Sequence, residues 1–75
     1  MKDLLLFIAT SLVDQPDQVT VEEADGPEGI VLTLSVAQED MGKVIGKQGR
    51  IAKAIRTVVR AASMKQDKPV FVEIQ

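Results

Sequence analysis

Two helix-like segments joined by a glycine-containing turn lie between two strand-like segments, and this order leaves few topologies open. Residues 30–36 (IVLTLSV) and 70–74 (VFVEI) both carry an apolar side chain at every second position. Between them lies a helical pattern that is interrupted at Gly46-Lys47-Gln48-Gly49. Parallel strands need a long crossover connection, whereas antiparallel strands are joined by short turns. We therefore expect the two strands to be parallel neighbours in one sheet.

Residues 1–40 supply a helix and a β-hairpin. Leu4–Val13 has the spacing of an amphipathic helix, which ends before Pro16 because proline cannot continue the helical hydrogen bonds. Val19–Glu22 is expected to pair with Ile30–Val36 across a turn rich in glycine, proline and acidic residues. The side chains that we expect to be buried in these elements are Leu5, Ile8, Ala9, Leu12, Ile30, Leu32, Leu34 and Val36.

Residues 41–75 supply the crossover and a closing strand. Glu39 and Asp40 offer an N-cap for a short helix, Met41–Ile45. A second, amphipathic helix runs from Arg50 to about Met64. The apolar side chains that we expect to be buried in this helix and the closing strand are Ile51, Ile55, Val58, Ala62, Val70, Val72 and Ile74.

These elements predict an α+β fold of order α-β-β-α-α-β, a three-stranded mixed sheet with three helices on one face. Seventy-five residues suffice for one modest core, so we expect residues 1–75 to form a single domain. The absence of Cys fits a reducing, cytoplasmic setting. The apolar run Leu4–Ala9 is far shorter than the ~20 residues that span a bilayer, and no clear cleavage site follows it. We therefore expect neither a membrane anchor nor a signal peptide.

Charge is divided unevenly along the chain. Residues 1–40 contain one lysine and nine acidic residues, a net charge of −8. Residues 41–75 contain eight basic and two acidic residues, a net charge of +6. The overall net charge of −2 therefore hides a basic half that suits a polyanionic partner.

The turn between the two crossover helices has the chemistry of an anion site. Its two glycines permit unusual backbone angles and have no Cβ to hold a ligand away. The helix that follows directs free N–H groups and the positive end of its dipole toward the turn. A Gly-x-x-Gly tetrapeptide alone is also explained by helix capping, so the surrounding elements and charges carry this prediction. The candidate anion-binding residues are Lys43, Gly46, Lys47, Gln48, Gly49, Arg50 and Lys53.

Other chemistries fit the sequence poorly. The segment Gly42–Gln48 has one residue too few between its glycines for a nucleotide P-loop, and Gln48 stands where Ser or Thr would hold magnesium. The G-x-G-x-x-G spacing of dinucleotide-binding folds is absent. Without His, Cys or Tyr, we expect no catalysis, and likewise no metal site, cofactor or small-molecule substrate.

Two further surfaces have two interpretations each. Arg56 and Arg60 lie on the polar side of the second helix, as a solvated face or as part of a nucleic-acid site. Leu6 and Phe7 lie off the buried stripe of the first helix, as isolated surface residues or as a partner interface. The sequence leaves both pairs of alternatives open.

The combined features resemble the KH domain, an RNA-binding fold whose GXXG loop clamps four nucleotides. VIGKQGR at residues 44–50 carries the GXXG motif, and the order of elements is similar to the type II arrangement of prokaryotes. LVDQPD at 12–17, DMGKVIGKQGR at 40–50 and AKAIR at 52–56 resemble the small bacterial single-KH proteins of the KhpA family. The resemblance covers essentially the whole chain.

The resemblance implies that single-stranded RNA binds in a groove. One wall would be the two helices with their glycine turn, and the other would be the closing strand with the loop Lys65–Pro69. The aliphatic floor would contain Val44, Ile45 and Val72.

The resemblance also implies pairing, as a homodimer or as a heterodimer with a larger KH-containing RNA-binding protein. It implies a role as an RNA chaperone or post-transcriptional regulator that affects cell shape and envelope growth. Two alternatives remain: a KH-fold protein-interaction module that does not bind RNA, and a single-stranded DNA binder. Only contacts to the 2′-hydroxyl would separate RNA from DNA.

Overall fold

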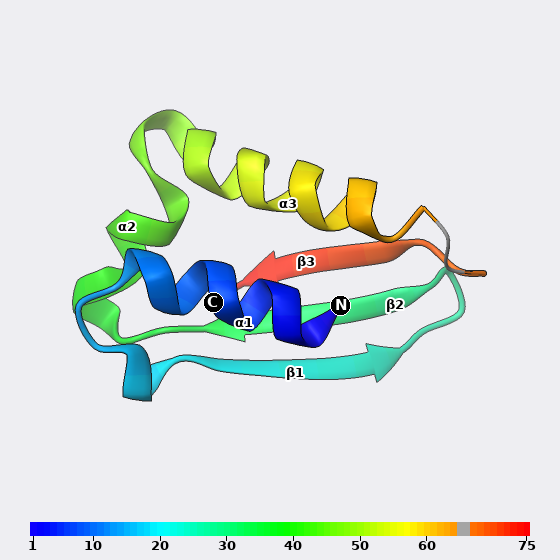
Figure 1. Ribbon diagram of the computed structural model, residues 1–75, viewed down its shortest axis with the longest axis horizontal. Helices are drawn as coiled ribbons and strands as arrows, with labels where there is room; N and C mark the ends of the chain where they lie inside the picture. The colour runs from blue at the N-terminus through cyan, green and yellow to red at the C-terminus, as the bar shows by residue number, and fades with distance from the viewer. Residues whose placement is uncertain (65–66) are drawn as a thin grey trace.

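The computed structural model describes residues 1–64 and 67–75 (Figure 1). Its helices and strands follow the order that the sequence predicts. The helices are α1 (Lys2–Leu12), α2 (Met41–Ile45) and α3 (Arg50–Ala62), and the strands are β1 (Thr20–Asp25), β2 (Ile30–Ser35) and β3 (Val70–Ile74). Short 3₁₀ turns lie at Pro16–Gln18, Gln38–Asp40 and Lys47–Gly49. Lys65 and Gln66, which belong to the predicted loop before β3, lie outside the described residues.

The sheet is mixed, with strand order β1-β2-β3. β1 and β2 are antiparallel, in a register that places Val21 opposite Leu34. β2 and β3 are parallel, with Leu32 opposite Val72. The parallel pairing is confirmed because α2 and α3 provide the crossover between these two strands (Figure 1).

The hairpin is longer than its alternation predicts. β1 continues to Asp25, whereas the predicted strand ended at Glu22. A tight turn makes this possible, because Gly26 N–H donates to Gly29 O at 2.8 Å and Gly29 N–H donates to Gly26 O at 3.3 Å. The exposed acidic residues of β1 therefore belong to a paired strand and not to a loop.

The helices cover one face of the sheet and enclose one hydrophobic core. Leu5 and Ala9 of α1 and Val59 of α3 meet the strands there, and each has no exposed surface. The complete buried cluster is Leu5, Ala9, Val19, Val21, Leu32, Leu34, Val44, Ile55, Val59, Val70 and Val72. The predicted three helices on one face of a three-stranded mixed sheet are confirmed.

The predicted buried face of α3 is partly wrong. Ile55 is buried as predicted and Ile51 is half-buried against the core, whereas Val58 is 47% exposed. Ala52 and Val59 are buried instead, so the helix is rotated relative to the prediction by less than the ~100° that separates consecutive residues. Both stripes are apolar, and periodicity alone therefore does not choose between them; packing against the sheet does. Ala62 is also exposed.

Other predicted core residues lie at the edges of the core. On α1, Ile8 is half-buried and Leu12 is 37% exposed, because the helix ends at Leu12 as the chain leaves the sheet. The strand-end residues Ile30, Val36 and Ile74 are half-buried and pack against the cluster from outside.

Candidate nucleic-acid interface

The turn between α2 and α3 is formed by residues with left-handed backbone angles. Gly46 has φ 76°, Gln48 has φ 58° and Gly49 has φ 74°. Gly46 N–H donates to Gly42 O at 2.8 Å, and Gly49 N–H donates to Gly46 O at 3.2 Å. These two hydrogen bonds and the positive φ angles end α2 and lead the chain into α3.

One N–H group that was predicted to be free is engaged. The Arg50 N–H, at the start of α3, donates to Lys47 O. Within the described residues, the N–H groups of Lys47 and Gln48, between the glycines, have no acceptor. These two groups are available to a ligand, in addition to the N–H groups that the first turn of a helix leaves free.

The space around Gly46 differs from the space around Gly49. A Cβ on Gly46 would lie 2.5 Å from Cγ1 of Ile51, so this glycine makes room for a neighbouring side chain. A Cβ on Gly49 would have no heavy atom within 4 Å. Only Gly49 therefore leaves its missing side chain as open space at the surface, where a ligand can approach the backbone.

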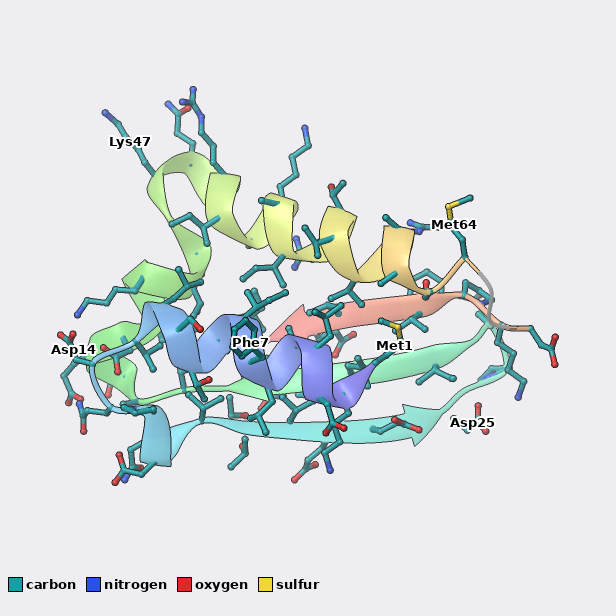
Figure 2. The ribbon with its side chains drawn as sticks, in the orientation of Figure 1. Met1, Phe7, Asp14, Asp25, Lys47 and Met64 are labelled. Carbon is teal, nitrogen blue, oxygen red and sulfur yellow. The ribbon has the colours of Figure 1, made fainter. Side chains whose placement is uncertain are left out.

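Three exposed cations surround the turn. Lys47, Arg50 and Lys53 are all exposed, and Lys47 projects away from the sheet (Figure 2). The Arg50 Nη2 atom lies 3.4 Å from Oε1 of the exposed Gln48. These side chains, with the free N–H groups, make a positive surface that suits phosphate oxygens.

The predicted aliphatic floor is only partly accessible. Val44 has no exposed surface and belongs to the core, so its expected contact with RNA is wrong for this conformation. Its burial follows from the direction of α2, which turns Val44 toward the sheet. Ile45 is half-buried and keeps some surface for a ligand. Val72 is 6% exposed, and it faces the core with its side chain.

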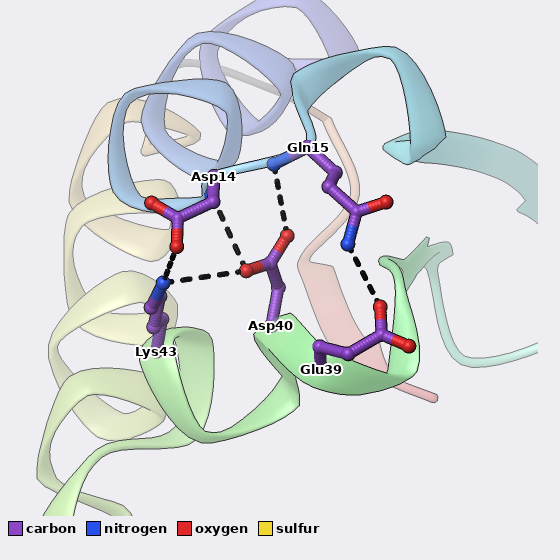
Figure 3. A network of polar contacts seen from close by, with 5 residues as sticks. All are labelled: Asp14, Gln15, Glu39, Asp40 and Lys43. Atoms are coloured by element: carbon purple, nitrogen blue, oxygen red, sulfur yellow. Dashed lines mark hydrogen bonds and ion pairs between the residues drawn. The ribbon is translucent and has the colours of Figure 1, made fainter.

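Lys43 is held in a network of acidic groups and not beside the turn's free surface (Figure 3). Its Nζ forms an ion pair with Asp14, and it lies 3.5 Å from Asp40 Oδ1. The Asp14 hydrogen bond, opposed by partial desolvation, and the charges of both carboxylates raise the pKa of Lys43. Two carboxylates thus offset the charge that was predicted to attract nucleic acid.

The buried Asp40 connects the members of this network through its carboxylate. Its carboxylate accepts hydrogen bonds from Asp14 N–H at 3.3 Å and from Gln15 N–H at 3.0 Å, and it makes no side-chain cap on α2 (Figure 3). Asp40 occupies the predicted N-cap position of α2, but its carboxylate bonds to the backbone that follows α1 instead of capping the helix. Burial alone would raise the pKa of Asp40, but the two N–H groups and Lys43 outweigh it and lower that pKa.

The polar side of α3 turns toward the free edge of β3. Arg56 Nε donates to Val72 O at 3.2 Å, and the Arg60 Cζ atom lies 5.6 Å from the centroid of the Phe71 ring. A small hollow of ≈ 140 Å³ lies between these elements and is lined by Arg56, Arg60, Val70, Phe71 and Val72. The hollow adjoins the closing strand, one wall of the predicted groove, and its lining includes Val72 of the predicted floor but not Val44 or Ile45. Phe71 was not among the predicted site residues, because its position opposite Val31 follows only from strand register.

The two residues of the predicted partner interface, Leu6 and Phe7, differ in exposure. Phe7 is 71% exposed and lies on the side of α1 that faces the viewer in Figure 2. Leu6 is half-buried and packs against the core. A separate apolar groove of ≈ 400 Å³ runs between α1 and α3 and is lined by Ile8, Leu12, Arg50, Ile51, Ala54, Ile55 and Val58. In the described part of the chain, no helix has the length and apolar character needed to cross a membrane.

Comparisons with known proteins match nearly the whole chain. Residues 2–74 match the family model described as KhpA/KhpB, KH domain. The chain is 66% identical over 74 residues to the RNA-binding protein KhpA of Clostridium acetobutylicum, covering 99% of each. It is 51% identical over 74 residues to the RNA-binding protein KhpA of Bacillus subtilis, covering 99% of this chain and 91% of that protein.

Solved structures of the protein Era are similar in fold. Aquifex aeolicus Era, crystallised with GDP and aluminium fluoride, superposes with a TM-score of 0.62 at 22% identity. The match covers 97% of this chain but only 28% of Era. The likeness therefore concerns the fold of one part of that larger protein.

Proposed function

Because this chain belongs to the KhpA/KhpB family of KH domains, we propose that it binds single-stranded RNA through the Gly46–Gly49 turn and the adjoining groove. Its relatives are named RNA-binding proteins, and the family is not catalytic. The order of elements is that of a type II KH domain, which residues 1–75 form as a single unit. The observation that carries the proposal is the open backbone at Gly49 beside free N–H groups and exposed cations.

The turn binds the RNA backbone. Phosphate oxygens accept hydrogen bonds from the N–H groups of Lys47 and Gln48 and approach closely at Gly49. Lys47, Arg50 and Lys53 add charge from exposed side chains. With so few phosphate contacts, binding by one domain is weak and salt-dependent, in the ~10⁻⁴ to 10⁻⁶ M range of non-specific sites.

The groove between α3 and β3 receives the bases. Ile45 offers apolar surface near the turn, while Val44 and Val72 support the groove from the core. Lys43 does not contact RNA but stabilises the fold, because its ion pairs with Asp14 and Asp40 connect α2 to the segment after α1. We therefore assign the backbone clamp to residues 46–50 and Lys53, with Lys43 as a supporting residue.

A charge-reversal experiment tests the proposal. Replacing Lys47→Asp and Gln48→Asp together removes one cation and adds two anions at the exposed turn. The matched control carries Lys2→Asp and Gln18→Asp, which make the same chemical changes at exposed positions on the acidic half. We expect the turn variant to lose binding to a pool of single-stranded RNA while the control retains it, with circular dichroism showing that both are folded. A folded turn variant that binds as well as wild type would overturn the proposal.

The same experiment separates the alternative functions. A KH-fold protein-interaction module would show no RNA binding in either variant, and the intact Lys47 between two glycines argues against it. A single-stranded DNA binder would use the same turn, and it would bind DNA and RNA oligonucleotides of one sequence equally well.

Self-association is the second part of the proposal. One domain with few contacts gains affinity when two copies engage one RNA. Phe7 on α1 is the most exposed aromatic side chain, and the apolar groove between α1 and α3 lies on the same two helices. We expect a second copy of the chain to cover this surface, with a larger KH-containing protein as the heterodimeric counterpart. Phe7→Glu should lower the mass observed in sedimentation, whereas Ser11→Glu on the same helix should not; an unchanged mass for Phe7→Glu refutes this interface.

The cellular role follows from the family and not from geometry. A small, weak, paired RNA binder suits an RNA chaperone or post-transcriptional regulator in the cytoplasm, with effects on cell shape and envelope growth. Deletion of the gene should change the abundance or folding of bound transcripts, measured by crosslinking and sequencing. If the crosslinked transcripts are unaffected, this role is wrong even where RNA binding holds.

A further inference from the structure

Phe71 lies where the RNA groove meets the open face of the sheet. Its neighbours in β3, Val70 and Val72, point into the core, so strand alternation places Phe71 on the face away from the helices. The ring is half-buried. It rests against the hairpin turn, because a Cβ on Gly29 would lie 3.1 Å from its Cε2 atom. Phe71 lies near the start of β3, and this end of the strand is close to the C-terminal end of α3 and far from the glycine turn (Figure 1).

Two arginines of α3 reach this aromatic surface. Arg60 lies over the Phe71 ring at 5.6 Å, and Arg56 donates through Nε to Val72 O at 3.2 Å. Within the described residues, neither guanidinium forms an ion pair. The two side chains are therefore directed cations at the edge of β3 and not a diffuse solvated face.

Two hollows meet at the same residues. The groove of ≈ 140 Å³ between α3 and β3 and a larger cleft of ≈ 500 Å³ on the open face share Arg56, Phe71 and Val72. The larger cleft continues to the hairpin turn, where Gly26, Pro27, Glu28 and Gly29 line it. A chain that leaves the groove can therefore continue around the edge of β3 onto the Phe71 ring.

The charged residues that line the two hollows favour different parts of a nucleotide. Arg60 lines the groove, Arg56 lines both hollows, and Glu28 and Glu73 line the open-face cleft. Carboxylates repel a phosphate but accept hydrogen bonds from base N–H groups, as Glu does from cytosine N4. The cleft volume lies within the range of sites that hold small ligands larger than a nucleobase. The cleft therefore suits a base, while the two arginines suit the phosphate that precedes it.

We propose that Phe71, Arg56 and Arg60 form an additional nucleobase-stacking site that extends the RNA path beyond the four-nucleotide groove. The site takes one unpaired base bearing an exocyclic amino group, which stacks on Phe71 and donates to the carboxylates of the cleft. Arg56 and Arg60 hold the adjoining phosphate. This inference rests on the proposed RNA-binding function, but it depends on different residues from those of the glycine turn.

The test measures stacking directly with 2-aminopurine, an amino-bearing base whose fluorescence is quenched when it stacks. Single-stranded RNA tetramers and hexamers of one core sequence carry the probe at either terminal position. Wild-type protein should bind the hexamer more tightly than the tetramer and should quench the probe at one end. Phe71→Leu, which keeps an apolar side chain in β3, should abolish that quenching. Stacking on a ring contributes ~1–3 kcal/mol per base, so hexamer affinity should fall about 5-fold or more while tetramer affinity is unchanged.

A second variant protects the test against misfolding. Arg60→Gln keeps the ring and removes one cation, and it should weaken hexamer binding and reduce its salt dependence while part of the quenching remains. Quenching that persists in folded Phe71→Leu, or equal wild-type affinities for tetramer and hexamer, would overturn the stacking site while RNA binding by the turn stands. No binding of either oligonucleotide would overturn the proposed function and the stacking site together.

Discussion

Three glycines near the turn should respond very differently to the addition of one methyl group. Gly46 has φ 76° and ψ 175°, a region that is essentially restricted to glycine, and an added Cβ would lie 2.5 Å from the Ile51 side chain. Gly49 has φ 74°, but an added Cβ would meet nothing within 4 Å. Gly42 lies in α2 without a positive φ, and its added Cβ also meets nothing. Alanine at these positions therefore separates backbone strain, steric overlap and ligand access.

The expected free energies follow from these geometries. Gly46→Ala combines about 1–3 kcal/mol of backbone strain with about 1–3 kcal/mol of overpacking, so it costs about 2–6 kcal/mol. Gly49→Ala costs about 1–2 kcal/mol because only its left-handed backbone is strained. Gly42→Ala stabilises the exposed helix by up to about 1 kcal/mol. A domain of this size has about 4–11 kcal/mol of stability in all, so Gly46→Ala removes a large part of it.

Thermal unfolding and RNA binding together test this reasoning. One kcal/mol shifts the Tm of such a domain by about 4–8 °C, so the expected Tm order is Gly42→Ala, wild type, Gly49→Ala, Gly46→Ala, from highest to lowest. At a temperature where Gly49→Ala is folded, fluorescence anisotropy should show RNA affinity about tenfold below wild type, since its methyl group displaces a charge-assisted backbone contact worth ~1.5 kcal/mol. Gly42→Ala should bind normally. Wild-type affinity in Gly49→Ala, or a Gly46→Ala protein as stable as Gly49→Ala, would refute the assignment of the two glycines.

Further measurements address the network, the core and the charges. Because its folded-state pKa is lowered, Asp40 stabilises the fold above the ordinary Asp pKa of about 4, and this contribution is lost as the pH falls through the lower folded value. Asp40→Asn should therefore lower the Tm at pH 7, and its curve should converge with wild type in acid; parallel curves would contradict this. Val59→Ala should cost about 1–3 kcal/mol in urea unfolding and Val58→Ala less than about 0.5, the reverse of the order that helical periodicity suggests. With three phosphate contacts, log affinity should fall against log salt with a slope of about −2, and Lys47→Ala should reduce that slope by about 0.7; an unchanged slope would remove Lys47 from the contacts.

The position of each helix and strand along the chain can be predicted from the sequence, because it depends on the residue types of a few neighbouring positions. Alternation identified the strands 30–36 and 70–74, and their separation by two helices predicted the parallel pairing that the structure shows. The glycine pair marked the turn for the same reason, since left-handed backbone angles require residues that tolerate them. The turn was therefore placed correctly between α2 and α3, and its role in binding nucleic acid stays a prediction.

Side-chain contacts between segments far apart in the sequence could not be predicted from local patterns. Asp40 was expected to cap α2, but it accepts N–H groups from Asp14 and Gln15, 25 or more residues earlier. Lys43 was expected to face nucleic acid, but the same segment supplies its carboxylate partner. A residue's partners across the fold depend on how helices lie against one another, and no local pattern encodes that choice.

By itself, the sequence determined the α-β-β-α-α-β order, the parallel crossover and the Gly46–Gly49 turn, because hydrophobic period, turn residues and chain connectivity act over a few neighbouring residues. Tertiary structure alone decided which apolar stripe of α3 is buried, that Gly46 makes room for Ile51 while Gly49 stays open, and that Arg60 lies over Phe71. These features depend on helix rotation and strand register, which are settled by packing the whole core at once.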